Sequence, residues 1–174
     1  MSAEPIAAEP SRHHTGGDRR LGLAVLSVTD THTEDDDTSG HLARALIESA
    51  HHRVVHYHLV GNSVADVRDA LEPWLKEPAV EGVVTVGGTG VSSRDLTVAA
   101  LEAMGGKRIE GFGELYRQLS FQEVGALAML SRASLFVLSG KPVFALPGSE
   151  RAVRTAFERL ILPAVQHLVE ELER

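Results

Sequence analysis

The sequence contains no cysteine. This absence excludes disulfide bonds, thiolate metal sites and cysteine nucleophiles, so only histidine, aspartate and glutamate remain as side-chain metal ligands. The sequence also has no apolar run that approaches the roughly 18 residues needed to cross a bilayer, and no hydrophobic signal region at its N-terminus. We therefore expect a cytoplasmic protein that neither spans nor contacts a membrane.

Basic residues are in the minority, with 17 Lys and Arg against 24 Asp and Glu and a formal net charge of -7. Proteins that bind nucleic acid need a clustered basic face, so this balance argues against nucleic acid as a partner. A phosphate ligand would have to be held by local features of the chain. Hydrophobic residues make up 43% of the sequence, which is enough for the core of one folded domain.

Residues 1–20 differ in composition from the rest of the chain. They are rich in Ala, Pro, Glu, Gly, Ser and Arg and show no periodicity, which predicts a disordered tail. We expect His13 and His14, which lie in this tail, to be solvated rather than bound to metal. Residues 21–174 are predicted to form a single domain.

Short apolar runs alternate with segments of helical spacing in the first part of this domain. The apolar runs predict three strands, over residues 21–28, 53–60 and 81–86. The segments that follow them predict three helices, over residues 41–50, 63–77 and 95–104. Such alternation, with glycine-rich turns after strands, is typical of βαβ units, so we expect an α/β fold with parallel strands and helices on both faces of the sheet.

The last part of the domain departs from this alternation. A helix is predicted over residues 119–133, with Ser120 as its N-cap and Glu123 closing a capping box. Apolar residues 134–138 and 142–146 flank the turn Ser139–Pro142, which predicts a hairpin and therefore a mixed, mostly parallel sheet.

Residues 150–174 predict a long amphipathic helix at the end of the chain. Proline lacks a backbone N–H group and clashes with the preceding helical turn. We therefore expect Pro163 to kink or divide this helix.

The most informative turn is Gly87-Gly88-Thr89-Gly90, between a buried strand and a helix. Glycines allow positive φ and a close approach of ligand to the backbone, so successive N–H groups can converge on an anion. The spacing matches neither a Walker A sequence nor a G-x-G-x-x-G fingerprint. The turn therefore predicts a phosphate site of another kind, and the alternative is a tight turn that binds no ligand.

A second turn of this type, Pro147-Gly148-Ser149, also follows a strand. Ser149 suits the N-cap of the next helix, and the same geometry can present its hydroxyl to a ligand. In parallel α/β sheets, ligands bind at the carboxyl ends of the strands. We expect these two glycine turns and the loop after the first strand to border one cleft.

Carboxylates near these loops are candidates for magnesium binding. Asp30 follows the first strand and Asp95 follows the glycine turn, although Asp95 would serve equally well as a first-turn helix carboxylate. The acidic run from Glu34 to Asp37 is predicted to be mostly a solvated face, with Asp37 or Ser39 as a helix cap. His56 and His58 alternate with apolar residues, which favours a strand over a metal site.

From about Leu21 to its end, the sequence resembles the MoaB/MogA family of molybdenum cofactor biosynthesis proteins. Several motifs carry the resemblance in the order that the family has them, and one of them, around Gly111-Phe112-Gly113-Glu114, resembles the MoaB branch more closely. The motifs are Leu26-Ser27-Val28-Thr29-Asp30, Asp37-Thr38-Ser39-Gly40, Gly87-Gly88-Thr89-Gly90 with Asp95, Gly111-Phe112-Gly113-Glu114, Leu130-Ser131-Arg132-Ala133 and Leu146-Pro147-Gly148-Ser149.

The resemblance implies a three-layer α/β/α fold, assembly into trimers or hexamers, and binding of molybdopterin. Active members of the family adenylylate molybdopterin with ATP and Mg²⁺ and release pyrophosphate, and a molybdenum-insertion protein is a possible downstream partner. By the same resemblance, Gly87 to Gly90 hold phosphate and Asp95 supports magnesium and catalysis. The remaining motif residues are expected to line the cleft: Thr29, Asp30, Ser131, Pro147, Gly148 and Ser149.

The sequence departs from the family pattern at two places. Asn62 stands where the family commonly has a second catalytic aspartate, and Leu96-Thr97-Val98-Ala99 replaces the usual proline and acid after the phosphate turn. Asparagine can coordinate or hydrogen-bond but brings no negative charge to a metal site. The leading hypothesis is a molybdopterin adenylyltransferase. The alternatives are a non-catalytic molybdopterin carrier or scaffold, and an unrelated nucleotide-dependent enzyme.

Overall fold

The computed structural model describes residues 19–174. The tail predicted over residues 1–20, with His13 and His14, lies outside the described residues except for Arg19 and Arg20. Among the described residues, no helix combines the length and the apolar character needed to cross a membrane.

A six-stranded mixed sheet forms the centre of the molecule, with the strand order β2-β1-β3-β6-β5-β4. The four neighbouring strands β2, β1, β3 and β6 are parallel to one another, whereas β5 runs antiparallel to both β6 and β4. The predicted mostly parallel, mixed sheet is therefore confirmed. The strands are β1 Gly22–Val28, β2 Arg53–Val60, β3 Gly82–Val86, β4 Lys107–Ile109, β5 Ser134–Leu138 and β6 Lys141–Leu146.

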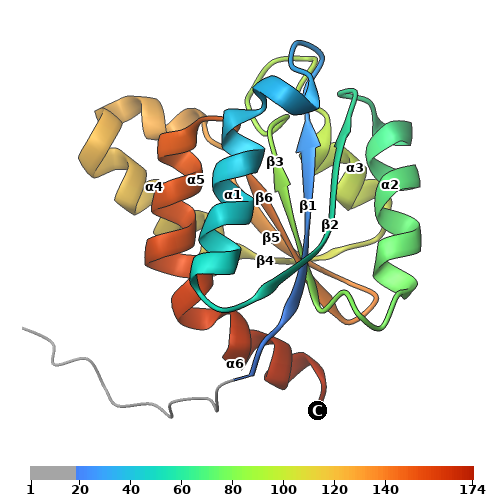
Figure 1. The fold of residues 1–174 in the computed structure, drawn as a ribbon. Helices are drawn as coiled ribbons and strands as arrows, with labels where there is room; N and C mark the ends of the chain where they lie inside the picture. Colours follow the sequence, from blue (N-terminus) through green and yellow to red (C-terminus); the bar gives the residue numbers. More distant parts are fainter. Residues whose placement is uncertain (1–18) are drawn as a thin grey trace, which may run out of the picture.

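Helices cover both faces of this sheet, so the expected three-layer α/β/α fold is confirmed (Figure 1). Every residue of β1 and β3 is buried, which explains why these strands have continuous apolar runs rather than alternating ones. On one face, α1, α4, α5 and α6 pack on Val25, Val84 and Phe144; on the other, α2 and α3 pack on Leu26 and Val83. The helices are α1 Thr38–Ser49, α2 Val64–Lys76, α3 Thr97–Ala103, α4 Glu110–Val124, α5 Glu150–Ala156 and α6 Leu162–Leu172.

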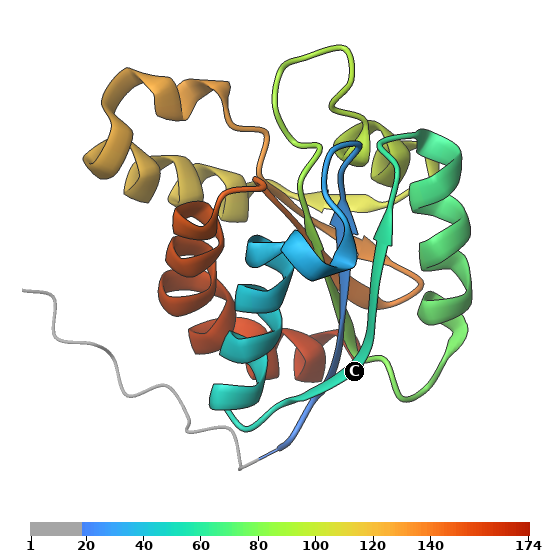
Figure 2. The same ribbon diagram turned by 45° about the horizontal axis from the view of Figure 1, so that its top comes forward.

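The structure corrects the helix predicted over residues 119–133. Helix α4 begins at Glu110, so Ser120 and Glu123 lie inside it rather than forming a capping box at its start. The buried side chains of Phe112 and Tyr116 pack in the core beside Phe144, and this tertiary packing outweighs the low helix propensity of the nearby glycines. After Val124 the chain continues as a short 3₁₀ helix, Gly125–Leu130, and Figure 2 shows both segments extending outward on one side of the sheet.

The predicted hairpin and the predicted division of the last helix are both confirmed. Ser139 and Gly140 connect β5 to β6 with φ angles of 51° and 75°, the positive values that a tight hairpin turn requires. A π-helical turn, Phe157–Ile161, separates α5 from α6, and Pro163 lies in the first turn of α6. The short edge strand β4 was not predicted.

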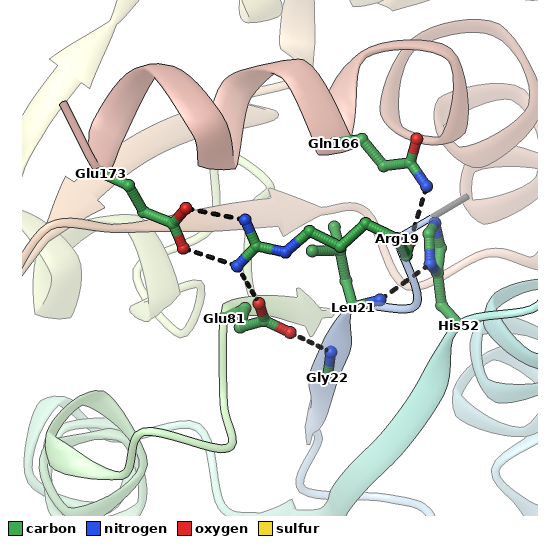
Figure 3. Close-up of polar contacts among 7 residues, drawn as sticks. All are labelled: Arg19, Leu21, Gly22, His52, Glu81, Gln166 and Glu173. Atoms are coloured by element: carbon green, nitrogen blue, oxygen red, sulfur yellow. Dashed lines mark hydrogen bonds and ion pairs between the residues drawn. The ribbon is translucent and has the colours of Figure 1, made fainter. Parts of the chain in front are cut away.

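A polar cluster fastens the start of β1 to the end of α6 (Figure 3). The Arg19 guanidinium donates to both carboxylate oxygens of Glu173, at 2.7 and 2.6 Å, and also to Glu81. The other oxygen of Glu81 accepts the N–H of Gly22 at 2.7 Å, and Nδ1 of the buried His52 accepts the N–H of Leu21 at 3.2 Å. These contacts lie at the amino end of β1, opposite the carboxyl ends of the parallel strands.

Candidate functional site

A polar cleft of about 360 Å³ lies at the carboxyl ends of β1, β3 and β6. Strands β2 and β3 lie on opposite sides of β1, so the chain connections on the two sides of β1 run in opposite directions. Ligands of open α/β sheets bind at such a switch point. The predicted meeting of the three loops is therefore confirmed. The cleft is lined by Ser27, Val28, Thr29, Asp30, Thr31, His32, Asp37, Thr38, Ser39, Asn62, Val86, Gly87, Gly88, Arg94, Asp95 and Gly148.

The glycine turn after β3 takes a backbone conformation that other residues rarely adopt. Gly87 and Gly88 have φ angles of 103° and 64°. A Cβ atom at Gly87 would lie 2.2 Å from the Val28 carbonyl oxygen, and a Cβ at Gly88 would lie 2.3 Å from Oγ1 of Thr97. Positive φ and close packing together account for the two consecutive glycines.

The backbone N–H groups of this turn are largely unused. Gly87 donates its N–H to the Leu146 carbonyl at 2.8 Å, but within residues 19–174 the N–H groups of Gly88, Thr89 and Gly90 donate no hydrogen bond. Successive unpaired N–H groups in such a turn form a concave site for an anion. The turn therefore has the donor arrangement expected of a phosphate site.

Asn62 joins the loop after β2 to the two loops that flank the cleft. Its backbone N–H donates to Oδ1 of Asp30 at 2.8 Å, and its side-chain Oδ1 accepts the N–H of Leu96 at 3.0 Å. The first contact fixes the Asp30 carboxylate beside the cleft. The second fixes the segment that leads from the glycine turn into α3.

Asp95 shapes the loop between the glycine turn and α3. Its Oδ2 accepts the N–H of Ser92 at 2.9 Å, and a Cβ at Gly90 would lie 2.6 Å from the same oxygen. Its carbonyl accepts a hydrogen bond from the guanidinium of Arg132 at 2.7 Å. Since α3 begins at Thr97, Asp95 is a loop residue that faces the cleft and not a first-turn helix carboxylate.

The loop between β1 and α1 is held by buried polar contacts. Asp37 caps α1 by accepting the N–H of Gly40 at 3.0 Å, and its other oxygen accepts the Tyr57 hydroxyl at 2.8 Å. Burial and the bond to Asp37 raise the pKa of the Tyr57 hydroxyl above its usual range. Ser39 donates its hydroxyl to the Gly148 carbonyl at 2.8 Å, which ties this loop to the second glycine turn.

One buried hydroxyl in the cleft lacks a protein partner. Ser27 is 2% exposed, and its Oγ has no hydrogen bond among the described residues. Buried polar atoms are nearly always paired, with protein or with another molecule. Among these residues the Ser27 hydroxyl is thus an unpaired polar group beneath the floor of the cleft, and it is not itself exposed to a ligand there.

The donors available for a magnesium ion are oxygens. Asp30 and Asp95 each use one carboxylate oxygen for a backbone N–H and keep the other free of hydrogen bonds within residues 19–174. Mg²⁺ is usually bound through one or two carboxylates together with substrate phosphates, so the chemistry of these two side chains suits it. Over the same residues, no group of three or more His, Asp or Glu side chains could hold a metal ion alone.

Seven of the residues predicted for the site line the cleft: Thr29, Asp30, Asn62, Gly87, Gly88, Asp95 and Gly148. The other five, Thr89, Gly90, Ser131, Pro147 and Ser149, lie outside its lining.

Three of those five residues have other contacts. Ser149 caps α5, the Ser131 hydroxyl accepts the N–H of Ala133, and the carbonyl of the buried Thr89 accepts the N–H of Arg132. Any role of these residues in ligand binding stays a prediction.

Arg94 and His32 are among the cleft side chains that sequence reasoning missed. Arg94 is the one lysine or arginine in the described lining, so it alone adds a full positive charge there. The sequence signal for Arg94 was its position directly before Asp95, the aspartate that follows the glycine turn.

Comparisons with known proteins show the family to which the chain belongs. The family described as "Probable molybdopterin binding domain" matches residues 15–167. Molybdenum cofactor biosynthesis protein B of Bacillus cereus is 38% identical over 165 residues, covering 94% of this chain and 98% of the relative. The protein of the same name from Staphylococcus carnosus is 40% identical over 160 residues, covering 90% and 94%.

Solved structures show the same fold. A crystal structure of molybdenum cofactor biosynthesis protein B has a TM-score of 0.86 at 39% identity, covering 90% of this chain and 98% of that one. The tungsten cofactor synthesizing protein MoaB from Pyrococcus furiosus has a TM-score of 0.81 at 31% identity, covering 90% and 99%. The chain therefore belongs to the family of molybdopterin-binding domains, in its MoaB-like branch.

Proposed function

We propose that this protein acts in molybdenum cofactor biosynthesis as a molybdopterin adenylyltransferase, which converts molybdopterin and ATP to adenylyl-molybdopterin and pyrophosphate. The observation that carries the proposal is the glycine turn, whose N–H groups at Gly88, Thr89 and Gly90 donate no hydrogen bond within residues 19–174 and whose first two residues line the cleft. This turn lets an acidic protein hold a phosphate ester without a basic surface.

In this reaction an oxygen of the molybdopterin phosphate attacks the α-phosphorus of ATP. A new P–O bond forms, the bond from the α-phosphorus to the β-phosphate oxygen breaks, and pyrophosphate leaves. Two anions must meet in line, so positioning and charge stabilisation supply most of the catalysis. Backbone N–H groups of the glycine turn and the Arg94 guanidinium are among the donors available for this purpose.

Asp30 and Asp95 would hold Mg²⁺ together with the phosphates of the bound ATP. The ion would supply positive charge at the reacting phosphates. Asn62 and Ser92 hold these two carboxylates in place through their backbone N–H groups.

A non-catalytic molybdopterin carrier is the second candidate. The observation that favours it is Asn62, a neutral side chain in the cleft where the family commonly has an aspartate. A carrier needs the phosphate-binding turn but no metal at the reacting phosphates.

We further propose that the protein assembles into trimers or hexamers, and that its product passes to a molybdenum-insertion protein. Large apolar side chains are exposed on α4 and the 3₁₀ helix after it, with Leu127 at 67% and Met129 at 77%. Burial in a subunit interface would remove this surface from water. The same observation rules out core packing as the reason for the apolar composition at these two positions.

Incubation with molybdopterin and Mg-ATP, followed by chromatography, separates the two functions. A transferase yields the AMP conjugate of molybdopterin. A carrier retains unmodified molybdopterin in the protein fraction after gel filtration.

A further inference from the structure

We propose that Asn62 is a hydrogen-bond donor to the phosphate ester that binds in the cleft, and not a neutral replacement for a metal-binding aspartate. The inference rests on the proposed phosphorylated ligand and adds a recognition residue to it. It follows from the hydrogen bonds of the Asn62 side-chain amide, whose oxygen has a partner and whose NH₂ group has none among the described residues.

The orientation of the Asn62 amide is fixed by its partner. Leu96 offers a backbone N–H, which can only donate, at 3.0 Å from the side chain of Asn62. The amide atom that faces it must therefore be the oxygen, because the alternative places two donors against each other. The carbonyl end of the side chain is occupied in holding the segment between the glycine turn and α3.

The amino end of the same side chain is free. Nδ2 of Asn62 donates no hydrogen bond within residues 19–174, and it is not among the buried polar atoms that lack a partner there. Since Asn62 lines the cleft, this accessible NH₂ group is available to a ligand. It adds two N–H donors to the site.

The neighbours of Asn62 place its side chain at the phosphate turn. A Cβ atom built on Gly88 would lie 2.9 Å from Oδ1 of Asn62, so the oxygen end of the amide lies beside the turn that has unpaired N–H groups. The backbone N–H of Asn62 donates to Asp30 at 2.8 Å, which restricts the position of the residue further. Nδ2 is bonded to the same carbon as this oxygen, so an oxygen anion bound at the turn would have a neutral side-chain donor within reach.

Aspartate at this position would keep the hydrogen bond to Leu96 but lose the NH₂ donors. Its carboxylate could still accept the N–H of Leu96, so this clamp, the hydrogen bond that holds the loop before α3, would remain. It would lose both donors and add negative charge next to a phosphate, which makes binding depend on a cation. With Asn62, a phosphate ester can bind before any metal ion does.

The chain offers a direct probe, because Asn62 is its only asparagine. Protein labelled with [¹⁵N]asparagine has one side-chain NH₂ signal. We expect this signal to shift and saturate on titration with molybdopterin or with AMP in the presence of EDTA. A shift with molybdopterin alone assigns Asn62 to the pterin phosphate, and a shift with AMP alone assigns it to the nucleotide. If neither compound moves the signal, the inference is wrong.

Calorimetry of Asn62→Asp provides the second measurement. In EDTA we expect its affinity for the compound that shifts the amide signal to fall about 10- to 100-fold, since a hydrogen bond to a charged group is lost. Hydrogen exchange at the Leu96 amide should remain as slow as in the wild type, which shows that the clamp is intact. Gln122→Glu makes the same chemical change at an exposed position on α4, and should leave affinity unchanged.

These measurements separate the inference from the proposed function. A wild-type protein that binds through Asn62 but forms no AMP conjugate contradicts the transferase and leaves the inference intact. A wild type that forms the conjugate while Asn62→Asp binds in EDTA as tightly as the parent contradicts the inference and leaves the transferase intact.

Discussion

The side-chain hydroxyl of Thr97 donates a hydrogen bond to the carbonyl of Gly87 at 2.8 Å, and the backbone N–H of Thr97 donates to the carbonyl of Gly88 at 3.1 Å. Thr97 is buried at the start of α3 and thus donates a hydrogen bond to each of two successive carbonyls of the glycine turn. With these carbonyls directed at Thr97, the shape of the turn is fixed before any ligand arrives.

Thr97→Val tests this relationship. Valine fills nearly the same volume, but the buried Gly87 carbonyl loses its hydroxyl donor, so the free energy of unfolding should fall by about 1–3 kcal/mol. Affinity for molybdopterin should fall as well, because the turn is released. Thr155→Val, which removes a hydroxyl that donates to the Glu123 side chain away from the cleft, is the control. Equal stability of the two variants in urea unfolding would contradict the role of Thr97.

Gly88→Ala is expected to abolish binding of molybdopterin and ATP. The new Cβ would lie 2.3 Å from Oγ1 of Thr97 and would carry the strain of a φ angle of 64°. Gly105→Ala carries the same kind of strain, at a φ of 77°, with no atom within 4 Å of its Cβ. That control should lose about 1–2 kcal/mol of stability and keep its affinity. Unchanged calorimetric affinity in a folded Gly88→Ala protein would show that the ligand binds elsewhere.

Asp95→Asn should separate catalysis from binding. The amide oxygen can still accept the N–H of Ser92, so the loop is preserved while one charged contact to magnesium is lost. A contact of about 1.5–3 kcal/mol corresponds to roughly a 10- to 100-fold lower rate of adenylylation under saturating Mg-ATP. Molybdopterin affinity should change much less. Asp69→Asn, at an exposed position on α2, is the control. If Asp95→Asn turns over at the wild-type rate, Asp95 has no part in the reaction.

The stability of the protein should fall as the pH drops below about 6.5, because of His52. Burial, with a smaller contribution from His51, lowers the pKa of His52 below its ordinary value, and Glu81 opposes this shift. The unfolded chain then takes up a proton at a pH where the folded chain does not, so acid favours unfolding. The neutral imidazole is also the form that accepts the Leu21 N–H through Nδ1 (Figure 3).

His52→Asn keeps an acceptor for Leu21 and removes the titration, so its stability should depend less on pH below about 6.5. Urea unfolding followed by the fluorescence of Trp74, the only tryptophan, measures both proteins. Above about pH 7, where His52 is neutral in both states, the two curves should run parallel. A variant as sensitive to acid as the wild type would assign the effect to other groups.

The exposed apolar side chains of the α4 region predict self-association. Light scattering at micromolar concentration should give the mass of three or six subunits of 18.7 kDa. Replacing the 67% exposed Leu127 with Asp should shift the mass toward that of the single subunit without unfolding it. An 18.7 kDa particle for the wild-type protein would contradict the assembly.

Much of the fold could be predicted because the buried strands β1 and β3 are continuous apolar runs and the turns after the strands contain glycine. The start of α4 was predicted wrongly, since Phe112 and Tyr116 are held in a helix by contacts with distant residues rather than by local propensity. The loops of the site were predicted from their places after strands. The linkage of Asn62 to Leu96 was not predicted, because residues 34 positions apart meet only when the sheet brings their loops together.

Release of pyrophosphate tests the central claim most directly. Wild-type protein incubated with Mg-ATP and molybdopterin should release one pyrophosphate for each AMP conjugate formed, and none when molybdopterin is omitted. Asp95→Asn should show the same stoichiometry at a reduced rate. Protein that binds molybdopterin and ATP together, yet releases no pyrophosphate over many times the binding lifetime, would contradict the transferase and leave a molybdopterin carrier.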